Sequence, residues 1–324
     1  MRRLLLALAA AFVLAAGLSL PAAAQDYPNK PIKMVISFGA GGGSDIIGRI
    51  LAQRMQEKLG QSVVVENKPG AGGILGNEQV ANAPNDGYTI GMQTAGQIIA
   101  AAMTKNMRYD PINSFEWVGQ IATAGLLIVT RPDFPYKDIK SLVAAAKKNP
   151  DQIKFGSPGF GATQHLAAEL FKQTAGVNML HVPYRTSPEA LAALLSKNID
   201  VLFDTVTALL GQTQTGQVHA LAVTGKDRFP AVANVPAAIE SGVVPNYDVT
   251  TWYGFFVPKG TPKPVIDKLN KVTNEMLAEQ TIRERLVKAG VQVKGSTPDE
   301  WRSFMIAEYK KWGAVREKAG LEQR

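Results

Sequence analysis

Short apolar runs alternate with longer stretches of helical spacing along almost the whole chain. The first run, residues 32–38, predicts a buried strand, and the apolar positions between residues 46 and 59 then recur on one helical face. Such an alternation is typical of parallel sheets covered by helices. The pattern therefore predicts the α/β fold class.

The same alternation continues towards the C-terminal end. We expect strands where a short apolar or β-branched run is bounded by turn residues, and helices where the apolar spacing changes to about 3.6. Further strands are expected at residues 63–66, 88–93, 126–130, 153–156, 200–204, 220–224 and 252–257. Helices are expected after a turn at 69–76, at 141–148, 163–174 and 189–195, and as two stretches beyond residue 262.

Two strand-turn-helix units share one design. The first glycine turn, residues 39–43, and the second glycine turn, residues 157–161, each lie between a predicted strand and a predicted helix. Backbone N–H groups at a helix start lack intrahelical partners, and the helix dipole makes that end positive. Each turn therefore suits an anion such as a carboxylate. A single turn of this kind is equally common without a ligand, and only the pair favours binding.

The first glycine turn departs from both nucleotide-binding patterns. A dinucleotide fingerprint needs a third glycine after Gly39 and Gly41, but Ser44 stands in that place. A P-loop needs Lys-Ser or Lys-Thr after Gly48, where Arg49-Ile50 stands. A nucleotide-dependent enzyme that has lost its usual spacing remains one alternative.

The chain begins with the features of a secretory signal peptide. Arg2 and Arg3 precede an apolar run at residues 4–20, and a group of small residues ends at Ala24. The run is shorter than the roughly 20 residues that a membrane-spanning helix needs, which disfavours an uncleaved anchor. We therefore expect residues 1–24 to be a cleaved signal peptide and the mature protein to be soluble and periplasmic.

Composition narrows the function classes. The chain has no cysteine, which excludes disulfides, thiolate metal sites and cysteine nucleophiles, and only three histidines, which disfavours a histidine-rich metal site. Its net charge of +8 comes from scattered lysines and arginines without interleaved aromatic residues. This balance suits an anionic ligand and argues against nucleic-acid binding. The length suggests two lobes.

Specific motifs extend over essentially the whole mature chain. They are Pro31-Ile32-Lys33, Phe38-Gly39-Ala40-Gly41-Gly42-Gly43-Ser44-Asp45, Glu66-Asn67-Lys68-Pro69-Gly70-Ala71-Gly72-Gly73, Asp86-Gly87-Tyr88-Thr89, His165-Leu166, His181-Val182-Pro183-Tyr184, Leu221-Ala222-Val223-Thr224 and Trp252-Tyr253-Gly254. Together they resemble the substrate-binding (Bug) receptors of tripartite tricarboxylate transporters. The resemblance implies a type II periplasmic-binding-protein fold with two α/β lobes around a central ligand cleft. We expect lobe 1 to comprise residues 25–123 and 253–324, and lobe 2 residues 124–252.

The resemblance also implies a ligand site and partners. A small carboxylate is held by backbone amides, hydroxyls and waters of the two glycine turns, without a cofactor, a metal or any reaction. Binding is expected to close the lobes, and the closed monomer then docks on transporter membrane subunits or a sensor protein. The implied contacts are Phe38, Gly39, Ala40, Gly42, Gly43 and Asp45, then Ser157, Gly161, Ala162 and Thr163, with Thr94 and Asp204 as secondary contacts.

An exported hydrolase is the second alternative. Ser157, His165 and Asp204 have the residue types of a catalytic triad. However, no Gly-x-Ser-x-Gly pattern surrounds Ser157, because Phe155 stands two residues before it.

Three further positions leave their roles open. Asp45 either contacts the ligand or organises its own loop at the helix start. Asp204 would repel a ligand carboxylate unless it met an ammonium, a hydroxyl or water, so its orientation bears on the type of acid. Gly254 is expected where the chain bends between the lobes. The ligand itself stays open among di- and tricarboxylates, amino acids and aromatic acids.

Overall fold

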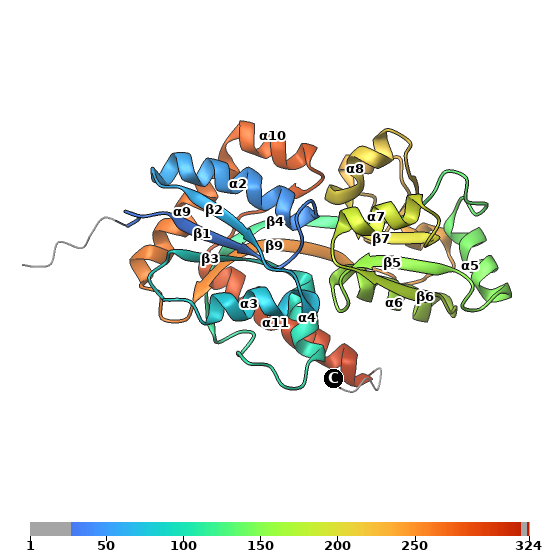
Figure 1. The fold of residues 1–324 in the computed structure, drawn as a ribbon, viewed down its shortest axis with the longest axis horizontal. Helices are drawn as coiled ribbons and strands as arrows, with labels where there is room; N and C mark the ends of the chain where they lie inside the picture. Colours follow the sequence, from blue (N-terminus) through green and yellow to red (C-terminus); the bar gives the residue numbers. More distant parts are fainter. Residues whose placement is uncertain (1–26, 319–322, 324) are drawn as a thin grey trace, which may run out of the picture.

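A computed structural model describes residues 27–318 and residue 323, so the expected signal peptide lies outside the described residues. The chain forms two α/β lobes side by side (Figure 1). Strand β4 (Phe115–Thr130) belongs to both lobes. It pairs with β9 (Thr250–Pro258) in lobe 1 and with β7 (Val201–Thr205) in lobe 2.

Lobe 1 is built on a mixed sheet with the strand order β2-β1-β3-β9-β4. The first three strands are parallel, and β9 is antiparallel to both of its neighbours. Apolar side chains fill both faces of this sheet, as expected for strands covered by helices on each side. The strand bounds are β1 (Ile32–Ile36), β2 (Val63–Asn67) and β3 (Thr89–Thr94), and the short β10 (Gln292–Val293) pairs with β4.

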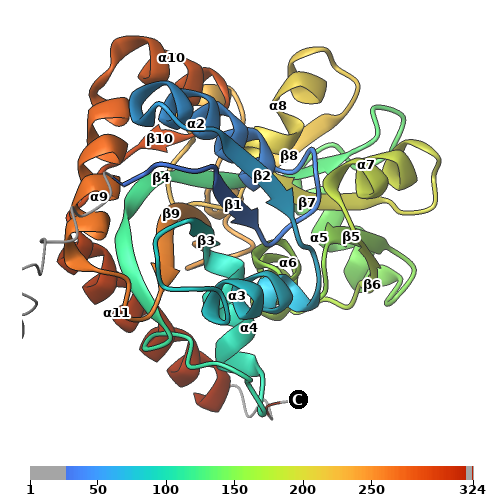
Figure 2. The ribbon, with the colours of Figure 1, turned by 60° about the vertical axis from the view of Figure 1, so that its left-hand side comes forward.

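The helices of lobe 1 cover the two faces of its sheet (Figure 2). On one face lie α2 (Gly43–Leu59), α9 (Lys263–Ala278) and α10 (Gln280–Lys288). On the other lie α3 (Ile74–Ala81), which follows the 3-10 turn η1 (Ala71–Gly73), α4 (Ala95–Met103) and α11 (Pro298–Lys318). Among the described residues, no helix is long and apolar enough to cross a membrane.

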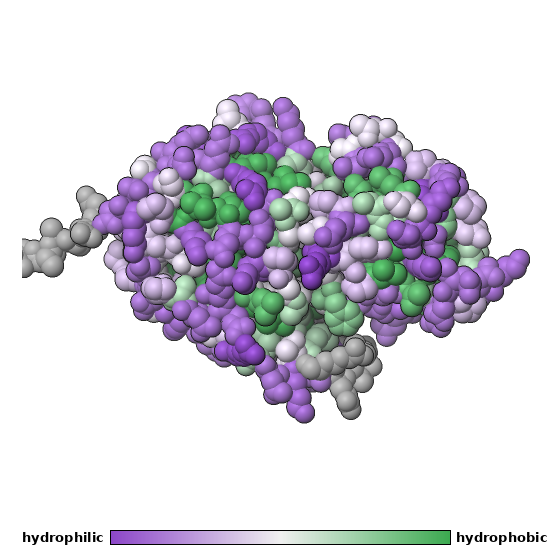
Figure 3. Space-filling model, in the orientation of Figure 1, coloured by the Kyte–Doolittle hydropathy of each residue, from purple (hydrophilic) through white to green (hydrophobic). Residues whose placement is uncertain are grey.

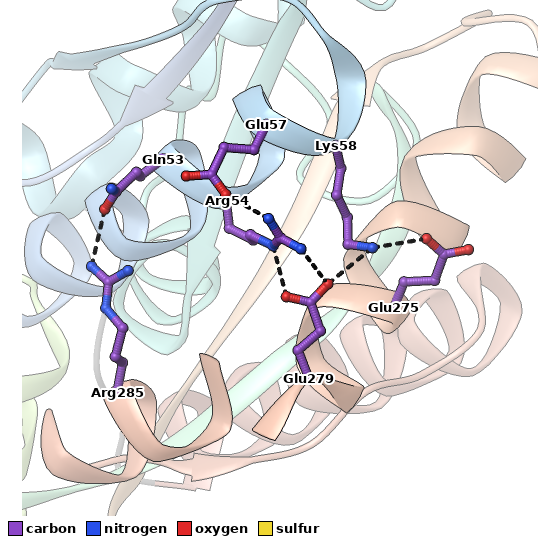
Figure 4. A network of polar contacts seen from close by, with 7 residues as sticks. All are labelled: Gln53, Arg54, Glu57, Lys58, Glu275, Glu279 and Arg285. Carbon is purple, nitrogen blue, oxygen red and sulfur yellow. Dashed lines mark hydrogen bonds and ion pairs between the residues drawn. The ribbon is translucent and has the colours of Figure 1, made fainter. Parts of the chain in front are cut away.

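An ion-pair network joins α2 to the junction of α9 and α10 (Figure 4). Arg54 donates two hydrogen bonds to Glu279, of 2.7 and 2.9 Å, and Lys58 adds ion pairs to Glu279 and Glu275. The Arg54 and Lys58 partners hold the pKa of Glu279 at about 2. The paired groups are partly exposed, so we expect the network to fix the position of α2 more than to add stability.

Lobe 2 has the strand order β4-β7-β5-β6, and β8 pairs with the other edge of β4. Along β4, Leu126 and Ile128 face one core with α5 and α6, whereas Leu127 and Val129 face a second core with α7 and α8. The remaining bounds are β5 (Lys154–Pro158), β6 (Leu180–Tyr184), β8 (His219–Val223), α5 (Ile139–Lys148), α6 (Thr163–Ala175), α7 (Ser187–Leu195), α8 (Val206–Gln214), η2 (Pro230–Val232) and η3 (Ala238–Ser241).

Strand directions bring the functional ends of both lobes together. From β3 to β9, from β9 to β4 and from β4 to β7 the direction reverses each time. The parallel strands of lobe 2 therefore run opposite to those of lobe 1. Since each lobe places its helix starts after the carboxyl ends of its strands, both sets of helix starts face the boundary between the lobes.

The structure differs from the sequence prediction in several elements. Strand β4 begins at Phe115, eleven residues before the predicted 126–130, and the C-terminal region holds three helices rather than two. Helices α4 and α8 and strand β6 were not predicted. Helix α4 is buried on all sides, so it has no amphipathic period. Gly254 is not a bend: it lies inside β9, and a Cβ atom there would be 2.2 Å from the Trp301 ring.

Candidate ligand site

A small cavity, called the inner cavity below, lies between the lobes where five helices begin. Its wall includes N-cap or first-turn residues of α2, α4, α6, α7 and α8. Its volume is about 30 Å³, whereas one water molecule needs about 10–15 Å³. The lining residues are Phe38, Gly39, Gly42, Gly43, Ser44, Thr94, Pro158, Thr163, Gln164, Arg185, Thr186, Ser187, Thr205, Thr251 and Tyr253.

The starts of α2 and α6 have N-cap residues whose side chains cannot cap a helix. The N-cap residues of α2 and α6 are Gly42 and Ala162, and no described side chain accepts a hydrogen bond from the first-turn amides of either helix. In contrast, Thr186 and Thr205 accept hydrogen bonds from first-turn amides of α7 and α8. The uncapped N–H groups of α2 and α6, one helix from each lobe, are therefore suited to bind an anion.

The first glycine turn lies directly against two helix starts of lobe 2. A Cβ atom on Gly39 would be 2.4 Å from Cγ2 of Thr186, and a Cβ atom on Gly43 would be 2.5 Å from Oγ1 of Thr205. Real Cβ atoms essentially never approach another heavy atom this closely. Glycine at these two positions therefore allows the backbone of lobe 1 to reach lobe 2.

Asp45 organises the first glycine turn. Its carboxylate accepts hydrogen bonds from the Gly41 amide at 3.0 Å, from Arg49 Nε at 2.9 Å and from Asn67 Nδ2 at 2.9 Å. Burial acts to raise the pKa of Asp45, but these hydrogen bonds outweigh it and hold the pKa below its usual value. With its oxygens occupied by these donors, the ionised carboxylate supports the loop.

The polar groups of the second glycine turn bind side chains of their own lobe. Ser157 Oγ lies 2.8 Å from His181 Nε2, and the Gly161 amide donates to His165 Nδ1 at 3.1 Å. The two imidazole rings stack with centroids 4.0 Å apart. Burial lowers the pKa of each histidine to about 4, so both rings are neutral at pH 7. The stacked pair therefore holds the turn without a net charge.

Asp204 lies beneath the wall of the inner cavity. Its Oδ1 atom accepts hydrogen bonds from the Thr205 amide at 2.7 Å and from Gln164 Nε2 at 3.3 Å, whereas Oδ2 has no hydrogen-bond partner among the described residues. Burial raises the pKa of Asp204 to about 6, against smaller opposite effects of Ser187, Thr205 and Gln164.

Tyr253 presents an unpartnered hydroxyl at the inner cavity. Its side chain is 1% exposed, and its OH makes no hydrogen bond with a described residue, although Thr205 and Thr207 are close enough to affect its pKa. Burial raises the pKa of Tyr253 well above its usual value. The hydroxyl therefore stays protonated and can donate to an anion in the cavity.

The predicted site residues divide into two groups. Phe38, Gly39, Gly42, Gly43, Thr94 and Thr163 line the inner cavity, whereas Ala40, Asp45, Ser157, Gly161, Ala162 and Asp204 do not. Several lining residues were not predicted from the sequence. They are Ser44, Pro158, Gln164, three residues that follow β6 (Arg185, Thr186 and Ser187), Thr205 at the end of β7, and Thr251 and Tyr253 in β9. Thr186-Ser187-Pro188-Glu189 was a readable signal, because Thr with Glu three residues later is a helix-capping pattern.

No chain of hydrogen bonds joins the three triad candidates of the hydrolase alternative, Ser157, His165 and Asp204. Ser157 pairs with His181 rather than with His165, and His165 binds the Gly161 amide. Asp204 binds Gln164 and Thr205 and makes no hydrogen bond with either histidine.

A larger hollow, called the outer hollow below, adjoins the inner cavity. Its volume is about 430 Å³, and it shares Phe38, Pro158 and Arg185 with the inner cavity. The rest of its wall comes from lobe 1 at residues 69–73 and from lobe 2 at Gly159, Phe160 and Tyr184. In Figure 3, white and pale residues gather where the two lobes meet, whereas purple dominates the outer parts of both lobes.

Comparison with known proteins places this chain in a family. The pattern of the tripartite tricarboxylate transporter family receptor matches residues 47–321. BugT of Bordetella pertussis is 32% identical over 316 residues, which cover 97% of each chain. The structure of the periplasmic binding protein BugD has a TM-score of 0.88 and 39% identity, covering 92% of this chain and 100% of that one. R. palustris Rpa4515 with adipate has a TM-score of 0.87 and 30% identity, covering 92% and 99%. The chain belongs to the receptor family of tripartite tricarboxylate transporters.

Proposed function

We propose that the protein is a periplasmic solute-binding receptor that captures a small carboxylate between its lobes and catalyses no reaction on it. The observation that carries the proposal is the inner cavity, at which the uncapped starts of α2 and α6 meet the unpartnered Tyr253 hydroxyl. Its volume suits the two oxygens of one carboxylate. The adipate held by the related Rpa4515 structure supports the same ligand class.

The carboxylate is bound without a salt bridge deep in the cavity. First-turn amides of Gly43 and Ser44 in lobe 1 and of Thr163 and Gln164 in lobe 2 are the proposed main donors. Phe38, Gly39, Gly42 and Thr94 shape the wall, while Ala40, Asp45, Ser157, Gly161, Ala162 and Asp204 support the two turns from behind. Both lobes must contribute, so binding favours the closed arrangement.

The proposed receptor is a monomer with lobe 1 at residues 25–123 and 253–324 and lobe 2 at residues 124–252. Support comes from β4, whose last pair with β9 is Gly125 with Thr250 and whose first pair with β7 is Leu126 with Thr205. We further propose that residues 1–24 direct export and that the closed form docks on transporter membrane subunits or a sensor. The family assignment supports the transporter docking.

A ligand screen tests this proposal. Thermal unfolding is measured with di- and tricarboxylates, amino acids, aromatic acids and nucleotides, and each mixture is assayed for product. A cognate acid at 100 times its dissociation constant is expected to stabilise the protein by about 2.7 kcal/mol. Stabilisation by nucleotides alone, or accumulation of product, would contradict the proposal.

Two matched tyrosine variants locate the site. Tyr253→Phe is expected to weaken binding of that acid about fivefold to tenfold with little change in stability, since its hydroxyl has no hydrogen-bond partner among the described residues. Tyr247→Phe removes a buried hydroxyl that bonds the Ala167 carbonyl at 2.9 Å, away from the cavity. This control is expected to lose about 1 kcal/mol of stability and no affinity. If Tyr247→Phe lost affinity and Tyr253→Phe did not, the inner cavity would be excluded as the ligand site.

A further inference from the structure

The two cavities divide the ligand space by size. The inner cavity, at about 30 Å³, has room for about two oxygen atoms, whereas the outer hollow, at about 430 Å³, has room for a larger organic group. Phe38, Pro158 and Arg185 line both spaces and therefore form their boundary. An acid whose carboxylate enters the inner cavity must extend past this boundary into the outer hollow.

The side chains of the outer hollow are mostly apolar, and one of them is charged. Phe38, Pro69, Pro158, Phe160 and Tyr184 contribute rings, and glycines and an alanine contribute most of the remaining surface. The wall contains no Asp or Glu among the described residues, and its single cationic side chain is Arg185. Such a wall favours a hydrocarbon spacer and disfavours a string of hydroxyl groups.

The Arg185 guanidinium is available to a ligand. Its backbone amide donates to Glu189 Oε2 at 3.0 Å, but the guanidinium makes no hydrogen bond or ion pair within the described part of the chain. Most arginines in the described part of the chain form ion pairs, as Arg54 does with Glu279 and Arg228 with Glu240. A guanidinium presents paired donors that match a carboxylate.

We propose that Arg185 determines specificity by binding the distal carboxylate of an elongated dicarboxylate with an apolar spacer. This inference rests on the proposed function and adds the far end of the ligand. The proximal carboxylate occupies the inner cavity, the spacer crosses the boundary beside Phe38 and Pro158, and the distal carboxylate meets Arg185 from within the outer hollow. A short or heavily hydroxylated acid fills this space less well.

Calorimetry with two ligand series tests the inference. Straight-chain dicarboxylates with four, six and eight carbons are compared with monocarboxylates of equal length, using the wild type, Arg185→Gln and Arg185→Lys. The wild type is expected to prefer the dicarboxylate of the best length about fivefold to tenfold over its monocarboxylate partner. Arg185→Gln is expected to lower dicarboxylate affinity more than monocarboxylate affinity and so to abolish this preference. Arg185→Lys retains part of the preference, since a lysine keeps the charge without the paired donors.

A charge-matched control separates contact from general attraction. Arg108 is exposed, pairs with Glu78 and lines neither cavity, so Arg108→Gln makes the same charge change elsewhere. It is expected to keep the wild-type preference. The inference is overturned if Arg185→Gln keeps the preference, or if Arg108→Gln loses it equally. If no acid of either series binds the wild type, the inference is also overturned, whereas the proposed function fails only if the wider ligand screen finds no acid that binds.

Discussion

The first and second glycine turns both join a strand to an uncapped helix start, yet they direct their polar groups differently. In the first turn, Gly39, Gly42 and Gly43 line the inner cavity, and Asp45 secures the loop from behind. In the second turn, Ser157 and Gly161 are bound to histidines of lobe 2, and Pro158 reaches the cavity instead. The comparison teaches that equal turn chemistry does not give equal ligand contact, because neighbouring side chains compete for the same groups.

The largest expected effect concerns two buried acids, Asp204 and Asp45. Their pKa values shift in opposite directions. For Asp204 the folded pKa of about 6 lies above the usual value, so the fold favours the protonated form and loses stability as pH rises from about 4 to 6. Asp204→Asn removes this loss. Relative to the wild type, the free energy of unfolding of the variant is expected to rise by about 3 kcal/mol between pH 3 and pH 7.

Asp45→Asn is the matched variant, with the opposite sign. The folded pKa of Asp45 is depressed, so its contribution is present above the unfolded pKa and is lost as pH falls through the folded value. Urea unfolding between pH 3 and pH 7 measures both variants. If the free energy of unfolding of both variants, relative to the wild type, changed with pH in the same direction, the proposed difference between Asp204 and Asp45 would be wrong.

A pair of glycine substitutions tests which turn closes on the ligand. An alanine at Gly43 would place its Cβ 2.5 Å from Thr205 Oγ1 and 2.8 Å from the Tyr253 hydroxyl, so Gly43→Ala is expected to weaken acid binding by about 30-fold or more. At Gly161 the nearest atom would be 3.9 Å away, but φ is +79°. Gly161→Ala is therefore expected to cost about 1 kcal/mol of stability and less than threefold in affinity. Calorimetric titration measures the affinity of each variant, and urea unfolding measures its stability. Similar affinity losses in both variants would mean that the two turns contribute equally to ligand binding.

The smallest expected effect separates the two serines. Ser44 lines the inner cavity, whereas Ser157 is bound to His181 and is fully buried. Ser44→Ala is expected to reduce affinity about threefold with unchanged stability, and Ser157→Ala to reduce stability by about 1 kcal/mol with unchanged affinity. Measuring the dissociation constant and the unfolding midpoint of each variant decides between them. An affinity loss confined to Ser157→Ala would assign the ligand contact to the second turn.

Local patterns predicted much of the fold. The strand at 32–38 and the helix at 163–174 were confirmed within about two residues at each end, because alternating apolar spacing and glycine turns act over short stretches of chain. The same reasoning missed α4, whose buried residues show no polar face, and most of β4, which is long because it crosses from one lobe to the other.

The sequence by itself determined that two helices begin after glycine-rich turns without a capping side chain, since Gly42 and Ala162 have no side-chain oxygen to offer. Only the tertiary structure decided where those helix starts point. Three reversals of strand direction bring the two lobes face to face, and residues as distant as Gly43 and Thr205 then meet. Such contacts depend on the packing of both lobes together, which no local stretch of sequence encodes.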